Sequence, residues 1–257
     1  QYGRKAEDVF KRASRFGDFS TTPRTVTCSQ FVETAFSRYA RSYTSGVGYD
    51  DYRSGIDRVI EHVNEREAAG DDGSFTYWYL PQYDKHCHEA GVADKKAWEI
   101  LTEIDEAIEE LAKELDGRAR IIITADHGQV DVPRERSPIM SEGTPIMDCL
   151  VSFPSGEPSV PVFHVQQGRE EEFRRLFEQD YGKIFTLLTS EEAAEMELFG
   201  PGELIEEARQ RLGTFIALAE EPAALLCQKM GKGVFHFAGI HGGMSAGEMM
   251  VPLVVVP

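Results

Sequence analysis

The sequence predicts an α/β protein built on a mostly parallel sheet. Two short apolar runs, at 75–80 and 121–124, are typical of strands that are buried on both faces of such a sheet. The amphipathic stretch between them predicts a helix that crosses over from one parallel strand to the next. Because open parallel sheets bind ligands beyond the carboxyl ends of their strands, we expect the functional residues there.

The other elements of the first half follow from hydrophobic spacing and turn residues. An amphipathic pattern over 5–16 predicts a helix ending at Gly17, and β-branched residues over 25–32 predict a strand. The helix expected over 55–67 has an apolar face made up of Ile56, Val59, Ile60 and Val63. The crossover helix ends at Gly117, and its apolar stripe consists of Leu101, Ile104, Ile108, Leu111 and Leu115.

The second half is richer in proline, serine and glycine, which favours loops around short elements. We expect 1–257 to form a single domain in which 133–235 includes a small, loop-rich peripheral insertion. Thr189 and Glu192 fit a capping box, so a short helix should begin there. The remaining expected elements are strands at 148–153 and 160–165, a helix at 169–181, and a hairpin of 215–218 with 223–226.

The composition is that of a soluble globular protein, with 41% hydrophobic and 28% charged residues in 257. A formal net charge of −17 argues against nucleic acid as a partner, because nothing neutralises a phosphate backbone. No apolar run reaches the length of a membrane span, and no signal peptide is visible. The spacing of the four cysteines matches no metal knuckle, so we expect reduced thiols and a cytoplasmic protein.

The first motif with ligand chemistry is Asp84 with His88, which follows the apolar run at 75–80. Residues four apart lie on the same side of a helical turn, and Gly91 permits a tight turn after them. Alone, this spacing is common among surface polar residues. His86 is a weaker rival ligand because its spacing from Asp84 directs it elsewhere, and Cys87 is expected to pack as a neutral thiol.

The second motif, Asp126 and His127 followed by Gly128, comes directly after three isoleucines and is more specific. A carboxylate and an imidazole buried together are costly unless they pair or bind a metal. The alternative is a capped helix start, with Asp126 as the cap and His127 incidental. The metal interpretation is favoured once the other motifs are considered.

The third motif is His241, which stands among glycines that keep the backbone clear for close approach to an ion or substrate. The alternative is a flexible loop that carries an ordinary histidine. His164 and His236 lie in strand-like sequence and are expected to be structural, and His62 is expected on a solvated helix face.

Carboxylate and imidazole together are the ligands of zinc or manganese, and three such clusters are enough for two ions side by side. Two adjacent divalent ions in an open site are typical of enzymes that hydrolyse phosphate-like esters. The sequence therefore predicts a two-metal hydrolase, with zinc or manganese as the ion.

These motifs, in this order, resemble the alkaline phosphatase superfamily, and within it the type I phosphodiesterase and nucleotide pyrophosphatase family. The resemblance runs from about Thr25 to the end, and its motifs are Asp84-x-x-x-His88-x-x-Gly91, Thr-Ala-Asp126-His127-Gly128, and Gly239-x-His241-Gly-Gly with Glu248-Met-x-Val-Pro-Leu253. It implies a central sheet sandwiched by helices that holds two zinc ions. One ion would be held by Asp84, His88 and His241, and the other by Asp126 and His127.

The sequence departs from the family pattern before Asp84. The family also uses an earlier strand-end aspartate and a threonine or serine nucleophile at a helix N-terminus, and neither is evident here. The segment 20–23 superficially resembles the nucleophile segment but lies too close to Asp84. We therefore expect the C-terminal portion of a longer protein, with its nucleophile upstream of Gln1. Family members usually have glycine where Cys87 stands, which could shift the turn at His88.

Two classes of function follow. The first is hydrolysis of phosphodiester or pyrophosphate bonds in a small phosphate ester or nucleotide, with phosphomonoesters, phosphonates and sulfate esters as rival substrates. A covalent phosphoryl intermediate would be expected from the resemblance. The second is a catalytically incomplete fragment or metal-binding module. Zinc content and turnover of p-nitrophenyl phosphodiesters distinguish the two.

Overall fold

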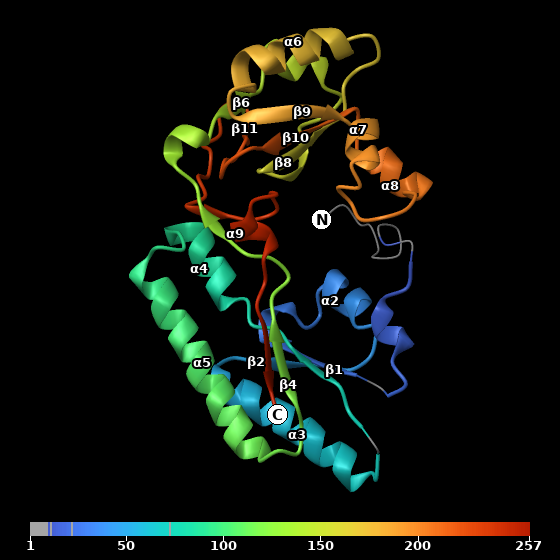
Figure 1. Cartoon of the computed structure of the whole chain (residues 1–257), viewed down its shortest axis with the longest axis vertical. Helices are drawn as coiled ribbons and strands as arrows, with labels where there is room; N and C mark the ends of the chain where they lie inside the picture. The colour runs from blue at the N-terminus through green and yellow to red at the C-terminus, as the bar shows by residue number, and fades with distance from the viewer. Residues whose placement is uncertain (1–9, 11, 22, 72) are drawn as a thin grey trace. The chain divides into compact units, whose positions relative to one another are not determined.

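The computed structural model describes residues 10, 12–21, 23–71 and 73–257, and they divide between two compact units (Figure 1). Unit 1 comprises Gln1–Tyr83, Trp98–Ile123 and Val254–Pro257, and unit 2 comprises Asp84–Ala97 and Thr124–Leu253. Each unit is described by itself. The expectation that residues 1–257 form a single domain stays a prediction.

The main sheet of unit 1 is parallel and has the strand order β2-β1-β3. β1 (Arg24–Cys28) pairs with β2 (Gly46–Tyr49) in a register that places Val26 beside Val47. On its other side β1 pairs with β3 (Thr76–Trp78), so that Val26 also lies beside Trp78. The short elements between β1 and β2 are a 3-10 turn (Ser29–Phe31) and α2 (Ala35–Ala40).

Two helices build the core of unit 1, α3 (Tyr52–Ala68) and α5 (Lys95–Leu115). α3 covers the helix expected over 55–67 but begins earlier, at Tyr52, because the Asp51 carboxylate accepts from the backbone N–H of Ser54 in a capping box. α5 ends before Gly117, whose φ of +77° favours glycine. The buried residues of this core are Val26, Tyr49, Ile56, Val59, Val63, Ala107, Leu111 and Leu115.

The expectation that the strands at 75–80 and 121–124 are buried on both faces is wrong for the described residues. Tyr77 of β3 is 43% exposed, because β3 lies at the edge of its sheet. Ile122 of β4 (Ile121–Thr124) is 62% exposed, because β4 pairs with β13 (Leu253–Val256) rather than with β3. A parallel sheet is present as predicted, but β3 and β4 belong to different sheets and their burial was overestimated.

Two further expectations in unit 1 need correction. His62 is not solvated but only 3% exposed, because it lies on the buried face of α3 and its Nδ1 is 2.8 Å from the Thr76 hydroxyl. Of the helix expected over 5–16, residues 5–9 and 11 lie outside the described residues. Residues 12–14 are not helical, and a 3-10 turn occupies Arg15–Asp18, where the Ser14 hydroxyl accepts from Phe16 N–H.

Unit 2 contains a four-stranded antiparallel sheet of order β7-β8-β10-β9. Its strands are β7 (Ser155–Glu157), β8 (Val160–Phe163), β9 (Phe185–Thr189) and β10 (Phe215–Ala219). α6 (Glu170–Tyr181) lies across this sheet (Figure 1) and packs Phe173 and Phe177 against Phe163 and Phe215. The predicted capping box is confirmed, since the Thr189 hydroxyl accepts from Glu192 N–H at the start of α7 (Ser190–Glu195), which precedes α8 (Glu206–Arg211).

Two expectations in unit 2 are wrong. The hairpin of 215–218 with 223–226 does not form, because β10 pairs with β8 and β9, whereas β11 (Leu226–Gln228) pairs with the distant β6 (Ile139–Ser141). The strand expected at 148–153 is a 3-10 turn (Met147–Cys149) followed by a single bridge from Leu150 to Val165.

A smaller substructure of unit 2 carries the candidate site residues. It consists of α4 (Gln82–Ala90), β5 (Val130–Asp131), β12 (Gly239–Ile240) and α9 (Ala246–Met249), with a 3-10 turn (Arg134–Arg136) after β5. β12 pairs antiparallel with β5. Helices and parallel strands together confirm the α/β class. Within the described residues, no helix combines the length and apolar character that a membrane crossing requires.

Candidate metal centre

α4 supplies two of the candidate ligands. Asp84 and His88 lie one helical turn apart on the same face, and Nε2 of His88 is 3.3 Å from Oδ1 of Asp84. The helix ends at Gly91, whose φ of +91° is the tight turn that the sequence predicted. A Cβ at Gly91 would lie 2.6 Å from Oδ1 of Asp131, so this close packing requires glycine.

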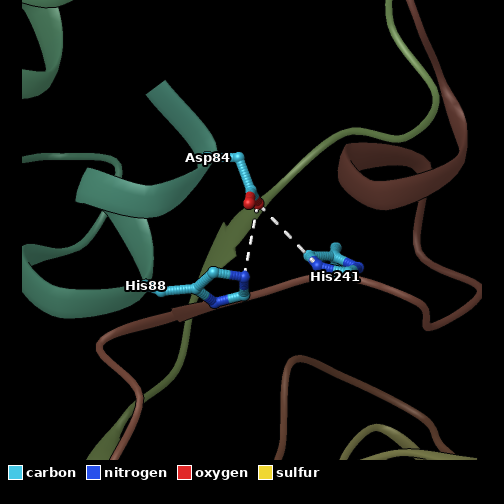
Figure 2. Close-up of side chains that lie close together, drawn as sticks. All are labelled: Asp84, His88 and His241. Atoms are coloured by element: carbon cyan, nitrogen blue, oxygen red, sulfur yellow. Dashed lines mark ion pairs between the residues drawn. The ribbon is translucent and has the colours of Figure 1, made fainter. Parts of the chain in front are cut away.

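β12 brings His241 to the same place from the far end of the sequence. A Cβ on Gly239 would lie 2.6 Å from the Cys87 carbonyl oxygen, so only glycine allows β12 to pack this closely on α4. Ala238 N–H also donates to the His88 carbonyl at 3.0 Å. As a result, Nε2 of His241 lies 3.8 Å from Oδ1 of Asp84, and both imidazoles face this carboxylate (Figure 2).

Asp84, His88 and His241 form what we call the triad, in which one possible ligand atom of each residue lies within 4.8 Å of the others. Oδ1 of Asp84 is buried and receives no hydrogen bond from any described residue. A buried polar atom without a partner is destabilising and calls for an explanation. A divalent cation would provide one, because one carboxylate and two imidazoles are a common ligand set for zinc.

The orientation of His88 also fits a metal ligand. Its Nδ1 lies 2.9 Å from the Gly239 carbonyl oxygen, which can only accept, so Nδ1 carries the proton. Nε2 therefore keeps its lone pair and points toward Asp84. Metal-binding histidines are typically held in this way, by a hydrogen bond from the other ring nitrogen.

The second candidate pair stands beside the triad but is less enclosed. The His127 ring stacks on the His241 ring, with 3.7 Å between centroids and 17° between planes. Nδ1 of His127 lies 2.9 Å from the Gly128 carbonyl oxygen, so Nε2 of His127 is free to bind a metal, as Nε2 of His88 is. Oδ1 of Asp126 is 3.6 Å from that Nε2, but the Asp126 side chain is 70% exposed. Asp126 and His127 thus form an open pair that contacts the triad through His241.

A buried glutamate fixes the loops that carry His127 and His241. Glu248 is 4% exposed, and its carboxylate accepts from Gly243 N–H at 2.8 Å and from the Ser245 hydroxyl at 2.6 Å. Its backbone carbonyl accepts from Gly128 N–H at 2.7 Å. Gly128 must be glycine, since a Cβ there would lie 2.0 Å from the Gly247 carbonyl oxygen. Glu248 therefore links the two loops.

The surroundings of His241 favour its neutral form. Burial is the main cause that lowers the pKa of His241, and the neighbouring His127 imidazole lowers it further, while the Asp84 carboxylate acts in the opposite direction. Neutral imidazole is the form that binds a metal. This effect therefore keeps His241 available as a ligand.

The rival ligands have other environments. Nε2 of His86 is 2.7 Å from Oδ1 of Asp94, so His86 is engaged outside the triad. Cys87 is fully buried under Gly239, as expected for a thiol that packs rather than binds. Of the residues that shape the site, sequence reasoning missed the role of Glu248. Its signal was present, because Ser-x-x-Glu at 245–248 is a capping box.

Comparisons with known proteins were consistent with this fold. The sequence model of the family described as type I phosphodiesterase / nucleotide pyrophosphatase matches residues 3–244. A search of curated proteins gave no match. Similar solved structures include murine ectonucleotide pyrophosphatase / phosphodiesterase 5 (TM-score 0.66, 13% identity) and the human protein of that name (TM-score 0.66, 15% identity), with 93% of this chain and 61% of each relative covered.

A third similar structure is phosphonoacetate hydrolase from Sinorhizobium meliloti 1021, with a TM-score of 0.58, 16% identity, and 93% of this chain and 66% of that chain covered. At these identities the likeness shows the fold, which is alkaline-phosphatase-like. The chain spans about three fifths of the length of the first two relatives. Because the family match extends over most of the sequence, the chain belongs to the type I phosphodiesterase / nucleotide pyrophosphatase family.

Proposed function

We propose that this chain carries the metal centre of a phosphoric ester hydrolase that cleaves phosphodiester or pyrophosphate bonds. One observation carries the proposal. The buried Oδ1 of Asp84 has no hydrogen-bond donor among the described residues, and imidazole nitrogens of His88 and His241 face it at 3.3 and 3.8 Å. Family membership supports the reaction class.

The triad would hold one divalent cation, and Asp126 with His127 would contribute to a second. The ligand types favour zinc, with manganese as the alternative. A bound divalent cation supplies Lewis-acid stabilisation of the negative charge that builds on phosphoryl oxygens. We assign no nucleophile within the chain.

The chain's own residues prepare this site in three ways. The Gly239 carbonyl fixes the His88 tautomer and ring orientation. The Asp84 carboxylate would offset the positive charge of a cation bound beside the two imidazoles. Glu248 holds the loops of His127 and His241 in register, so that their donor atoms are in place before any ligand binds.

The proposed substrate is a small phosphate ester or nucleotide. An inactive variant of the murine relative was solved with AMP, and the S. meliloti relative with phosphonoformate and with phosphonoacetate. These ligands share a phosphorus oxyanion. Because the net charge of this chain is −17, such an anion must be attracted locally by the metal site rather than by the overall field.

The test combines metal content with turnover. Elemental analysis of the purified chain should find zinc, and release of p-nitrophenol from p-nitrophenyl phosphodiesters measures turnover by the zinc-loaded chain. A parallel series of a phosphomonoester, a phosphonate and a sulfate ester ranks the rival substrates. Bound zinc without turnover of any ester would favour an incomplete, metal-binding module, and a chain that binds no divalent metal would overturn the proposal.

A further inference from the structure

We propose that a pocket beside the triad binds an uncharged aromatic or apolar group of the substrate and disfavours a second acidic group. The pocket lies within unit 2, has a volume of about 300 Å³, and is formed by 154–158, Pro161, 225–227, 233–235 and Phe237. This inference rests on the proposed function and defines the substrate class of the same site.

Three contacts place the pocket next to the triad. The ring of Phe237, which lines the pocket, lies 5.5 Å from the His88 ring. Glu157, which also lines it, packs against the loop of His241, since a Cβ on Gly242 would lie 2.7 Å from Cγ of Glu157. The hydroxyl of Ser159 donates to the His241 carbonyl at 3.0 Å and holds this wall against the triad. A group attached to phosphorus at the triad would therefore meet the pocket.

The walls are suited to a planar apolar group. Phe235 and Phe237 meet edge to face, with 4.9 Å between ring centroids and 80° between planes. Phe235 is 61% exposed, so its ring is available to a ligand. Further apolar lining comes from Pro154, Pro158, Pro161, Leu225, Leu226 and Val234. Aromatic rings gain from such edge-to-face and stacked contacts beyond simple burial.

The size of the pocket restricts the group. Ligand pockets range from about 300 to 1,000 Å³, and this one lies at the lower limit. A single ring or a short aliphatic chain fits such a volume better than a large polycyclic group.

The charge of the pocket disfavours an anionic group. Glu157 is its carboxylate, and none of the described residues that line it is lysine, arginine or histidine. Cys227 also lines it, but burial raises the pKa of this thiol to about 11, so it stays neutral near pH 7. A ligand with a carboxylate beside its phosphonate would place this second negative charge near Glu157, where no lining residue compensates it. Phosphonoacetate, found in the S. meliloti relative, is such a ligand.

The experiment measures three phosphonates on the zinc-loaded chain by isothermal titration calorimetry. Methylphosphonate reports the phosphorus oxyanion alone, phenylphosphonate adds a ring, and phosphonoacetate adds a carboxylate. We expect phenylphosphonate to bind about tenfold more tightly than methylphosphonate. Phosphonoacetate should bind more weakly than methylphosphonate.

Two variants and a control locate the effect. Phe235→Ala should remove most of the preference for phenylphosphonate over methylphosphonate. Glu157→Gln should improve phosphonoacetate binding relative to methylphosphonate binding. Phe199→Ala, which removes a partly exposed phenylalanine of unit 2 outside the pocket, should change none of the three affinities.

The outcomes separate this inference from the proposed function. If the chain holds zinc and binds methylphosphonate but shows no preference for the phenyl compound, or binds phosphonoacetate more tightly than methylphosphonate, the pocket assignment is overturned while the proposed function stands. If the zinc-loaded chain binds no phosphonate, the proposed function itself fails, and the pocket assignment fails with it.

Discussion

Two carboxylates of unit 2 have buried oxygen atoms, but their hydrogen bonds differ. The Glu248 carboxylate accepts from the Gly243 N–H and from the Ser245 hydroxyl. Oδ1 of Asp84 is also buried but receives no hydrogen bond from the described residues, and it faces two imidazoles instead.

This difference separates a structural carboxylate from a ligand. A buried carboxylate with good donors stabilises the loops that supply them. One without donors lowers stability and is retained where it binds something. The two residues should therefore respond oppositely to neutral replacement, one in stability and the other in metal affinity.

The largest effect is expected for Asp84→Asn. The neutral amide is a poorer ligand, so zinc affinity should fall by more than about 100-fold, beyond the loss typical of outer-shell changes. The free energy of unfolding of the metal-free chain should stay within about 1 kcal/mol or rise, because the buried carboxylate oxygen that lacks a hydrogen-bond donor is removed. Competition with a chelator and urea unfolding measure the two quantities. Glu89→Gln, an exposed acid on the same helix, is the control. Unchanged zinc affinity in Asp84→Asn would remove the main support for the metal centre.

Glu248→Gln should show the opposite pattern. Replacing one acceptor oxygen by an amide leaves Gly243 or Ser245 without its partner, so the free energy of unfolding of the metal-free chain should fall by about 1–3 kcal/mol. Zinc affinity should fall by about tenfold, because the loop of His241 is less firmly held. Urea unfolding without metal measures the first effect, and Glu195→Gln on α7 is the exposed control. Equal stability of the variant and the natural chain would show that Glu248 does not hold these loops.

Local sequence signals predicted several of the helices and the proximity of the triad residues. The helix over 55–67, the helix at 169–181 and the capping box at Thr189 are all set by residues within a turn or two of each other. Asp84 and His88 meet for the same reason, since four residues make one helical turn. His241 was placed correctly through its motif, and Gly239 explains physically how it reaches α4.

Features that depend on distant partners were not predictable from local patterns. The segment 223–226 looked like half of a hairpin, but β11 pairs with β6, which lies far upstream in the sequence. The exposure of Ile122 depends on which strand lies beside β4. The partner of His62 is Thr76 on β3, which the pattern of α3 does not contain. Hydrophobic spacing fixes which face of an element is apolar, but not what covers it.

Asp126→Asn tests the open pair and should have a smaller effect. Because Asp126 is largely exposed and contacts His127 rather than the triad, the variant should lower the occupancy of a second ion and the turnover by up to about tenfold. The first equivalent of zinc and the free energy of unfolding should be unchanged. Stepwise zinc titration with elemental analysis measures the occupancy of the first and second ions. Full second-ion occupancy and full activity in the variant would contradict the role of Asp126.

The smallest effect is expected for a buried imidazole, that of His62, rather than for a carboxylate. His62 is buried with a hydroxyl partner, so we expect it to act in stability and not in metal binding. Burial, followed by the positive charge of Arg24, lowers the pKa of His62 below its ordinary 6.5. Between this lowered pKa and 6.5 the unfolded chain binds more protons than the folded chain. The contribution of His62 to stability is therefore complete above pH 6.5 and is lost as the pH falls through this window.

In urea unfolding of the metal-free chain, His62→Gln should flatten the pH dependence of stability in this window and leave zinc affinity unchanged. If His62→Gln instead weakened zinc binding as Asp84→Asn is expected to, a partnered imidazole would be no guide to a structural role, and the distinction drawn from Asp84 and Glu248 would not extend to histidines.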